Sequence, residues 1–256
     1  MAARSAVPAL GRHVYGLAAI ALGLTLLVWG DFANVWHPVR PGVPYRMLLP
    51  YVVGACLLAG GVALQVPRSA RAGALSLAVL YLLAALLWLP RIVGYPHLFG
   101  TWSGFAEQFV VSAAAFVAYA SWAPRGATWA AGAIRAGRVA FGICVLALGW
   151  AHFSALAATA SMVPAWIPPG RSFWAIATGA AFLLAGVAIV AGQRAVLASR
   201  LLAAMLGGFA ALVWVPSIVS HSRQQVAWTG FIVTLAAAGA AWLLADVLRS
   251  ARVSTR

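Results

Sequence analysis

Eight ionisable side chains lie where long apolar stretches of the sequence end, and these are the residues most able to do chemistry. The acidic pair is Asp31, at the end of the first apolar stretch, and Glu107, one turn into the fourth. A neutral histidine can bind a metal ion or hydrogen-bond a quinone carbonyl, and a carboxyl group can take up a proton. The remaining candidates are the histidines and arginines of the neighbouring segments: His37, His97, His152, His221, Arg91 and Arg171.

Three interpretations of these residues remain open. They form a pocket for a small molecule such as a quinone, they hold a metal ion, or they are hydrated interfacial residues with an occasional ion pair, such as Glu107 with an arginine. The metal is poorly supported, because the sequence has neither a His-x-x-x-His nor a Cys-x-x-Cys spacing. A haem is equally poorly supported, because His152 has no clear axial partner. We therefore predict no metal, and we leave the cofactor unassigned with quinone as the candidate.

The composition excludes most soluble classes of protein. Apolar residues make up 64% of the 256 positions and charged residues 8%, against about a quarter charged in soluble domains. All 17 basic residues are arginine, so the lysine of a phosphate-binding loop and Schiff-base chemistry are both excluded. The arginines lie singly or in small groups between apolar runs, which is typical of membrane flanks and not of a nucleic-acid surface. The expected partner is a lipid bilayer, and no nucleic acid is expected.

The apolar runs predict an all-α, polytopic membrane bundle with eight transmembrane helices. Each run has roughly the 20 residues that a membrane-crossing helix needs, and helix satisfies every backbone amide in hydrocarbon. The predicted spans are 14–33, 47–66, 72–92, 104–122, 137–157, 172–191, 196–217 and 228–247.

The arginines predict the orientation of the spans. With a cytoplasmic N-terminus, the inner segments carry twelve arginines and the outer segments five, as the positive-inside rule requires. Both termini are then cytoplasmic, and the protein is a multi-pass protein of the cell membrane. The eight candidate residues fall on or near its outer side.

Two sequence strings recur at a separation of 126 residues. Trp102-Ser-Gly-Phe105 returns as Trp228-Thr-Gly-Phe231, and Leu87-Trp-Leu-Pro-Arg-Ile-Val93 returns as Val213-Trp-Val-Pro-Ser-Ile-Val219. The order of the strings is kept, which indicates an internal duplication. Residues 1–125 and 126–256 are thus predicted to be two tandem four-helix repeats. An even number of spans in each makes the repeats parallel.

The second repeat resembles the DoxX and DoxX-like membrane family. The resemblance rests on His152-Phe153, on Met162-Val-Pro-Ala-Trp-Ile-Pro-Pro169, and on Thr178-Gly179 followed by Leu184-Ala-Gly186. It implies a four-helix membrane unit related to small subunits linked to thiosulfate:quinone oxidoreduction. In one respect the chain departs from the pattern: many members carry a glutamate three residues after the glycine, where this sequence has Phe182.

Composition, topology and resemblance together favour an accessory or binding subunit of a membrane redox system, linked to quinone, with a polar pocket facing outward. The expected protein partner is a membrane redox subunit. Two alternatives remain: a membrane carrier or binder of a small apolar solute, and a structural scaffold without chemistry. The sequence leaves open whether the protein is an enzyme.

Overall fold

The computed structural model describes residues 10–124 and 126–254, and every regular element in this part of the chain is a helix. The first half comprises α1 (Leu10–Trp29), α2 (Leu49–Gln65), α3 (Ala70–Leu86), α4 (Leu89–Gly94) and α5 (Phe99–Ser121). The second half comprises α6 (Trp129–Ser154), α7 (Leu156–Met162), α8 (Arg171–Ala191), α9 (Ala195–Phe209), the π-helical turn η1 (Ala210–Trp214), α10 (Val215–Ser220) and α11 (Gln225–Ser254).

Six helical stretches are long and apolar enough to cross a membrane: 10–29, 70–94, 129–154, 171–191, 195–220 and 225–251. They coincide with six of the eight predicted spans. Helix α2 is apolar but has only 17 residues. Helix α5 has 23 residues and carries Thr101, Ser103, Glu107 and Gln108 along its first half. The protein is therefore an all-helical molecule with the apolar helices of a membrane protein.

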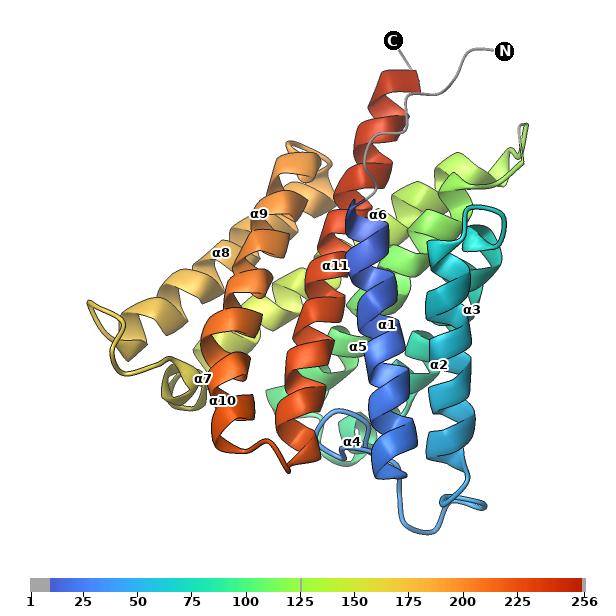
Figure 1. The fold of residues 1–256 in the computed structure, drawn as a ribbon. Coiled ribbons are helices and arrows are strands. Elements are labelled where there is room, and N and C mark those ends of the chain that lie inside the picture. The colour runs from blue at the N-terminus through green and yellow to red at the C-terminus, as the bar shows by residue number, and fades with distance from the viewer. Residues whose placement is uncertain (1–9, 125, 255–256) are drawn as a thin grey trace.

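The connections between the long helices alternate between the two ends of the bundle (Figure 1). The start of α1, the end of α11 and the connections α2–α3, α5–α6 and α8–α9 lie at one end. The connection α1–α2, the short helices α4, α7 and α10, and the turn into α11 lie at the other. The helix ends differ from the predicted ones by up to eight residues. Helix α6 begins at Trp129 and not at residue 137, and α1 ends at Trp29 and not at residue 33, so Asp31 belongs to the connection after α1.

Helices α1, α5 and α11 form the centre of the bundle, and small residues let them approach closely. Helix α11 is the most buried of the six apolar stretches, and its inward face is rich in alanine. A Cβ on Gly11 of α1 would lie 2.3 Å from the backbone nitrogen of Leu243. Without a driving force from water, such close backbone packing supplies much of the association between helices in lipid.

Prolines interrupt two helices at corresponding places. Pro90 lacks the N–H that would bond to the carbonyl of Leu86, and α3 ends at that residue. Pro216 likewise leaves the carbonyl of Leu212 without its α-helical donor, and the chain there forms the π-helical turn η1. Pro90 therefore follows a break between α3 and α4, and Pro216 follows a change of helix type.

Several contacts of the first half recur in the second half 126 residues later. The ring of Trp88 covers Gly104, and the ring of Trp214 covers Gly230. The Nε1 of Trp102 donates to the carbonyl of Pro96 at 3.0 Å, and that of Trp228 donates to Ser222 at 2.9 Å. A third pair of equivalent contacts joins one helix of each half to a helix of the other. Gly11 of α1 packs on Leu243 of α11, and the residues at a shift of 126 do the same, because Gly137 of α6 packs on Val117 of α5.

Candidate ligand cavity

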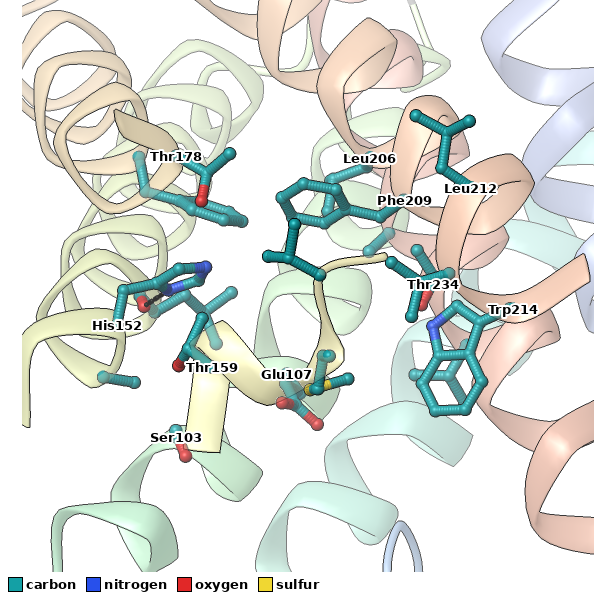
Figure 2. Close-up of a pocket in the computed structure, with 18 of the residues that line it drawn as sticks. Ser103, Glu107, His152, Thr159, Thr178, Leu206, Phe209, Leu212, Trp214 and Thr234 are labelled. Atoms are coloured by element: carbon teal, nitrogen blue, oxygen red, sulfur yellow. Dashed lines mark hydrogen bonds between the residues drawn. The ribbon is translucent and has the colours of Figure 1, made fainter. Parts of the chain in front are cut away.

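A cavity of about 380 Å³ lies in the second half of the molecule. Its wall is built mainly by α6, α7, α8, α9, η1 and α11, together with α5 and one residue of the α1–α2 connection (Figure 2). Most of the lining side chains are apolar, with Phe182, Phe209 and Trp214 among the largest. A volume in this range suits a small ligand.

His152 reaches the cavity from the last turn of α6. Its Nδ1 lies 2.9 Å from the carbonyl oxygen of Leu148, and its ring packs against Phe182 with centroids 5.0 Å apart. Figure 2 shows the other ring nitrogen turned toward the middle of the cavity. The wall thus fixes the ring and leaves Nε2 free to meet a ligand.

Glu107 reaches the same cavity from α5, a helix of the first half. Its carboxyl group forms no hydrogen bond or ion pair with any residue that the structure describes. In Figure 2 the carboxyl group points into the space between α5 and the chain segment around Thr159. The expected alternative of an ion pair between Glu107 and an arginine is therefore wrong. A carboxyl group without a partner in an apolar wall is costly, which favours a functional role.

Contacts among three tryptophans join the two halves at the wall of the cavity. Trp36, in the α1–α2 connection, lines the cavity and packs edge-on against Trp214, with ring centroids 5.8 Å apart. The carbonyl oxygen of Trp36 accepts a hydrogen bond from Nε1 of Trp88 at 3.3 Å. Trp88 and Trp214 occupy corresponding places in the two halves, so the first half closes one side of a cavity in the second.

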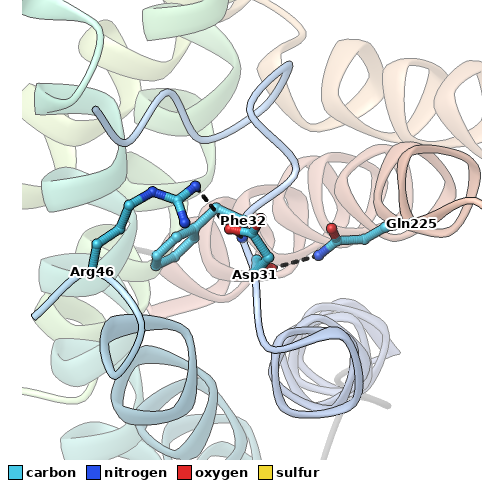
Figure 3. A network of polar contacts seen from close by, with 4 residues as sticks. All are labelled: Asp31, Phe32, Arg46 and Gln225. Atoms are coloured by element: carbon cyan, nitrogen blue, oxygen red, sulfur yellow. Dashed lines mark hydrogen bonds and ion pairs between the residues drawn. The ribbon is translucent and has the colours of Figure 1, made fainter. Parts of the chain in front are cut away.

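Asp31 does not line the cavity but anchors the α1–α2 connection (Figure 3). Its Oδ1 lies 2.8 Å from a guanidinium nitrogen of Arg46 and accepts the backbone N–H of Phe32 at 2.7 Å. Its backbone carbonyl accepts a hydrogen bond from Gln225 at 2.6 Å, which ties the connection to the start of α11. The Asp31 side chain is half exposed, and its contacts hold the α1–α2 connection to Arg46 and to the start of α11.

His37 is buried in the same connection and also lies outside the cavity. Its side chain is 6% exposed and its Nδ1 has no hydrogen-bond partner among the described residues. Burial lowers the pKa of His37 to about 4, because an apolar environment disfavours the charged ring.

The remaining four candidates lie at the surface, away from the cavity. His97 and His221 are exposed in the connections before α5 and α11, and Arg171 is the exposed first residue of α8. The guanidinium of Arg91 lies over the ring of Trp88 at 5.2 Å. Of the eight sequence candidates, only Glu107 and His152 come together. No group of three His, Cys, Asp or Glu side chains within the described chain could hold a metal ion.

The sequence candidates missed most of the polar residues that line the cavity. Ser103, Thr159, Thr178 and Thr234 contribute hydroxyl groups, and only Thr178 carried a signal, since it belongs to the Thr-Gly pair singled out above. Phe182 also lines the cavity, and the carboxyl group among the lining residues is that of Glu107, from α5.

No family model, curated protein or solved structure matches this chain.

Proposed function

We propose that this protein binds a small, mainly apolar ring molecule in the cavity, and that it serves as an accessory subunit of a quinone-linked membrane redox system. The observation that carries the proposal is the meeting of Glu107 and His152 at an otherwise apolar cavity. An apolar pocket with a few polar groups is the usual form of a small-molecule site. The resemblance of the sequence to the DoxX-like family favours quinone as the ligand class.

The proposal includes the membrane architecture expected from the sequence. In it, eight helices span the cell membrane as two parallel four-helix repeats, and both termini are cytoplasmic. The contacts that recur at a shift of 126 residues support the duplication. The start of α1 and the end of α11 lie at the same end of the bundle, which supports an even number of spans (Figure 1).

A quinone ring suits the walls of the cavity. Phe182, Phe209 and Trp214 offer flat apolar surfaces for stacking. His152 and Glu107 offer polar contacts at the ring substituents. The outer faces of α8 and α9 carry exposed apolar residues such as Leu184 and Leu201, which suit contact with lipid.

The test is an extraction of the purified protein in mild detergent, followed by mass spectrometry of the lipophilic molecules that it retains. We expect a quinone to be enriched over an unrelated membrane protein purified in parallel. The double variant His152→Phe, Glu107→Gln should lose it. The matched control Asp31→Asn removes a carboxylate outside the cavity and should retain it. Equal quinone content in the wild type and the double variant would contradict the proposal.

A carrier of a small apolar solute is the second candidate, and the interrupted helix α9–η1–α10 favours it. A π-helical turn beside a proline is a common place for a helix to bend, and Leu212, Val213 and Trp214 of this turn line the cavity. The pure protein in lipid vesicles would then move solute without a partner. A redox subunit would show no transport but would copurify with an electron-transfer protein.

The orientation is testable with single cysteines in a variant in which Cys56 and Cys144 are replaced by serine. Gly42 lies in the α1–α2 connection and Thr128 in the α5–α6 connection, and both are exposed. In intact cells, a membrane-impermeant maleimide should label Gly42→Cys and spare Thr128→Cys until the cells are opened. The reverse pattern would overturn the orientation.

A further inference from the structure

Helices α3 and α9 turn the same face inward, residue for residue. Each of the seven buried residues of α3 has a buried counterpart 125 positions later in the chain. The first pair is Ala70 and Ala195, where the two helices begin, and the last pair is Ala85 and Ala210, the latter being the first residue of η1. The two halves are therefore in register up to this last pair.

The register shifts by one residue directly after this pair. Trp88 and Trp214 each cover a glycine of the long helix that follows in the chain, and these two tryptophans are 126 positions apart. The chain thus takes three steps from Ala85 to Trp88 and four steps from Ala210 to Trp214. The second half has one additional residue between two points that pack alike in both halves.

The backbone accommodates the additional residue as the π-helical turn η1. In the first half, the N–H of Trp88 donates to the carbonyl of Ala85, three residues earlier, at 3.0 Å. In the second half, the N–H of Val215 donates to the carbonyl of Ala210, five residues earlier. Proline does not explain this difference, because each half has a proline two residues after its tryptophan. The wide turn therefore follows from the additional residue.

The wide turn forms part of the cavity wall. Its residues Leu212, Val213 and Trp214 all line the cavity, although they are consecutive. Consecutive side chains of a regular α-helix point about 100° apart, so three of them do not share one face. A π turn places more residues in each turn and brings consecutive side chains closer to one face. The additional residue thus widens α9 where it borders the cavity.

The corresponding place in the first half has a tight turn and a filled interior. Tyr81 is the counterpart of Leu206 and is almost completely buried, with its ring edge-on to Tyr15 at a centroid distance of 6.0 Å. Leu206 instead lines the cavity, and no residue of α3 does so. The wide turn and the cavity therefore occur together, in one half only.

We infer that the additional residue in η1 makes the second half a binding site, and that Leu212 and Val213 contact the ligand and limit its size. The inference rests on the proposed function in that it places the ligand in this cavity. A π turn within an α-helix is frequently found at a functional site. A chain shorter by one residue would form the tight turn of the first half and draw this wall inward.

Deletion of Ala211 tests the role of the additional residue. Ala211 is exposed and does not line the cavity, so the deletion shortens η1 without removing a lining side chain. We expect the variant to fold, because the first half forms the same path with the tight turn. Its affinity for a benzoquinone with one isoprenoid unit should fall at least about tenfold, or about 1.4 kcal/mol, in equilibrium dialysis with lipid nanodiscs. Deletion of Gly126, exposed in the α5–α6 connection, is the control and should bind normally.

A second measurement reports the cavity without any quinone. Val233 lines the cavity and is otherwise buried, so a thiol at this position is reached through the cavity. Val233→Cys is made in a chain whose Cys56 and Cys144 are replaced by serine, with and without the deletion of Ala211. Methylmercury chloride, a small neutral thiol reagent, should label the shortened chain at least about tenfold more slowly, as followed by mass spectrometry.

Two tryptophan variants keep the chain length and test the ligand contact directly. Val213→Trp puts a large ring into the cavity from η1 itself and should lower quinone affinity at least about tenfold. Val215→Trp makes the same change just after the turn, at an exposed residue outside the lining, and should leave affinity unchanged. Because both variants keep the π turn, this comparison decides the question if the deletion variant does not fold.

The outcomes distinguish this inference from the proposed function. Wild-type quinone affinity in the Ala211 deletion or in Val213→Trp overturns the inference and leaves the proposed function standing. Equal losses in Val213→Trp and Val215→Trp also overturn it. If the wild type does not bind quinone, the proposed ligand is wrong, and labelling of Val233→Cys decides the inference. Labelling slowed by the deletion or by Val213→Trp then supports it, and unchanged labelling refutes it.

Discussion

The first half of the molecule is filled where the second half is hollow. Leu22, Leu26 and Leu57 are almost completely buried in the first half. Leu148 and His152 lie 126 positions after Leu22 and Leu26, Phe182 lies 125 positions after Leu57, and all three line the cavity. A similar succession of helices thus supports a closed core in one half and a cavity in the other.

The connections contribute as much to this difference as the helices do. After α1, residues 30–48 fold over the bundle and place Trp36 and His37 in its interior. After α6, the chain forms α7 and a proline-rich segment, and both contribute residues to the wall of the cavity. A hollow site therefore needs both a gap between helices and walls supplied by connections.

The largest effect expected from this comparison is on stability, at the small residues. Gly23→Ala, in the packed half, puts a Cβ 2.6 Å from the backbone oxygen of Gly54 and 2.8 Å from the nitrogen of Leu58. We expect a loss of about 3 kcal/mol, at the upper end for overpacking. Gly207→Ala meets nothing within 4 Å and should raise stability by up to about 1 kcal/mol. Unfolding in mixed micelles measures both, and equal losses would refute the contrast.

A similar effect is expected at His37, on changing the pH. The buried ring has a folded-state pKa of about 4, whereas an unfolded histidine titrates near 6.5. Above pH 6.5 neither state binds the proton. Between pH 6.5 and 4 the unfolded state gains it first, so stability falls with falling pH, by about 3 kcal/mol in all. Melting temperatures of the wild type and His37→Gln across this range test it, since a slope unchanged in the variant would exclude His37 as the cause.

Filling the cavity should abolish ligand binding with little change in stability. Thr178→Phe places a ring in the cavity, and the hydroxyl that it removes bonds only within α8. We expect quinone affinity to drop at least about tenfold, while stability changes by less than about 1.5 kcal/mol. The control Leu184→Phe lies on the exposed face of the same helix and should bind normally. Wild-type binding in Thr178→Phe would place the ligand elsewhere.

The smallest effect is expected at the ion pair that anchors the α1–α2 connection. Asp31→Asn breaks the contact with Arg46, and because the Asp31 side chain is 52% exposed, the loss should be at most about 1 kcal/mol. The effect should shrink further in high salt. A loss that is much larger, or insensitive to salt, would mean that this connection supports the bundle more strongly than its exposure indicates.

Of the eight candidate residues named from the sequence, two lie together at the cavity and six lie elsewhere. Glu107 and His152 lie inside apolar stretches, where hydrocarbon makes a polar side chain conspicuous, and both line the cavity. Asp31, His97 and His221 lie in connections, whose folding depends on distant parts of the chain. The hydroxyl groups of Ser103 and Thr234 had no signal, because serine and threonine are common in helices and can satisfy themselves on the backbone.

The sequence by itself determined the helical class of this protein, its apolar environment and the approximate extent of its long helices, because length and hydropathy are local properties. Only the tertiary structure decided that Glu107 of α5 and His152 of α6 share one cavity and that Trp36 helps to close it. It also decided that Asp31 lies outside the cavity and pairs with Arg46. These facts depend on how helices from both halves pack together, and the packing follows from contacts between residues far apart in the chain.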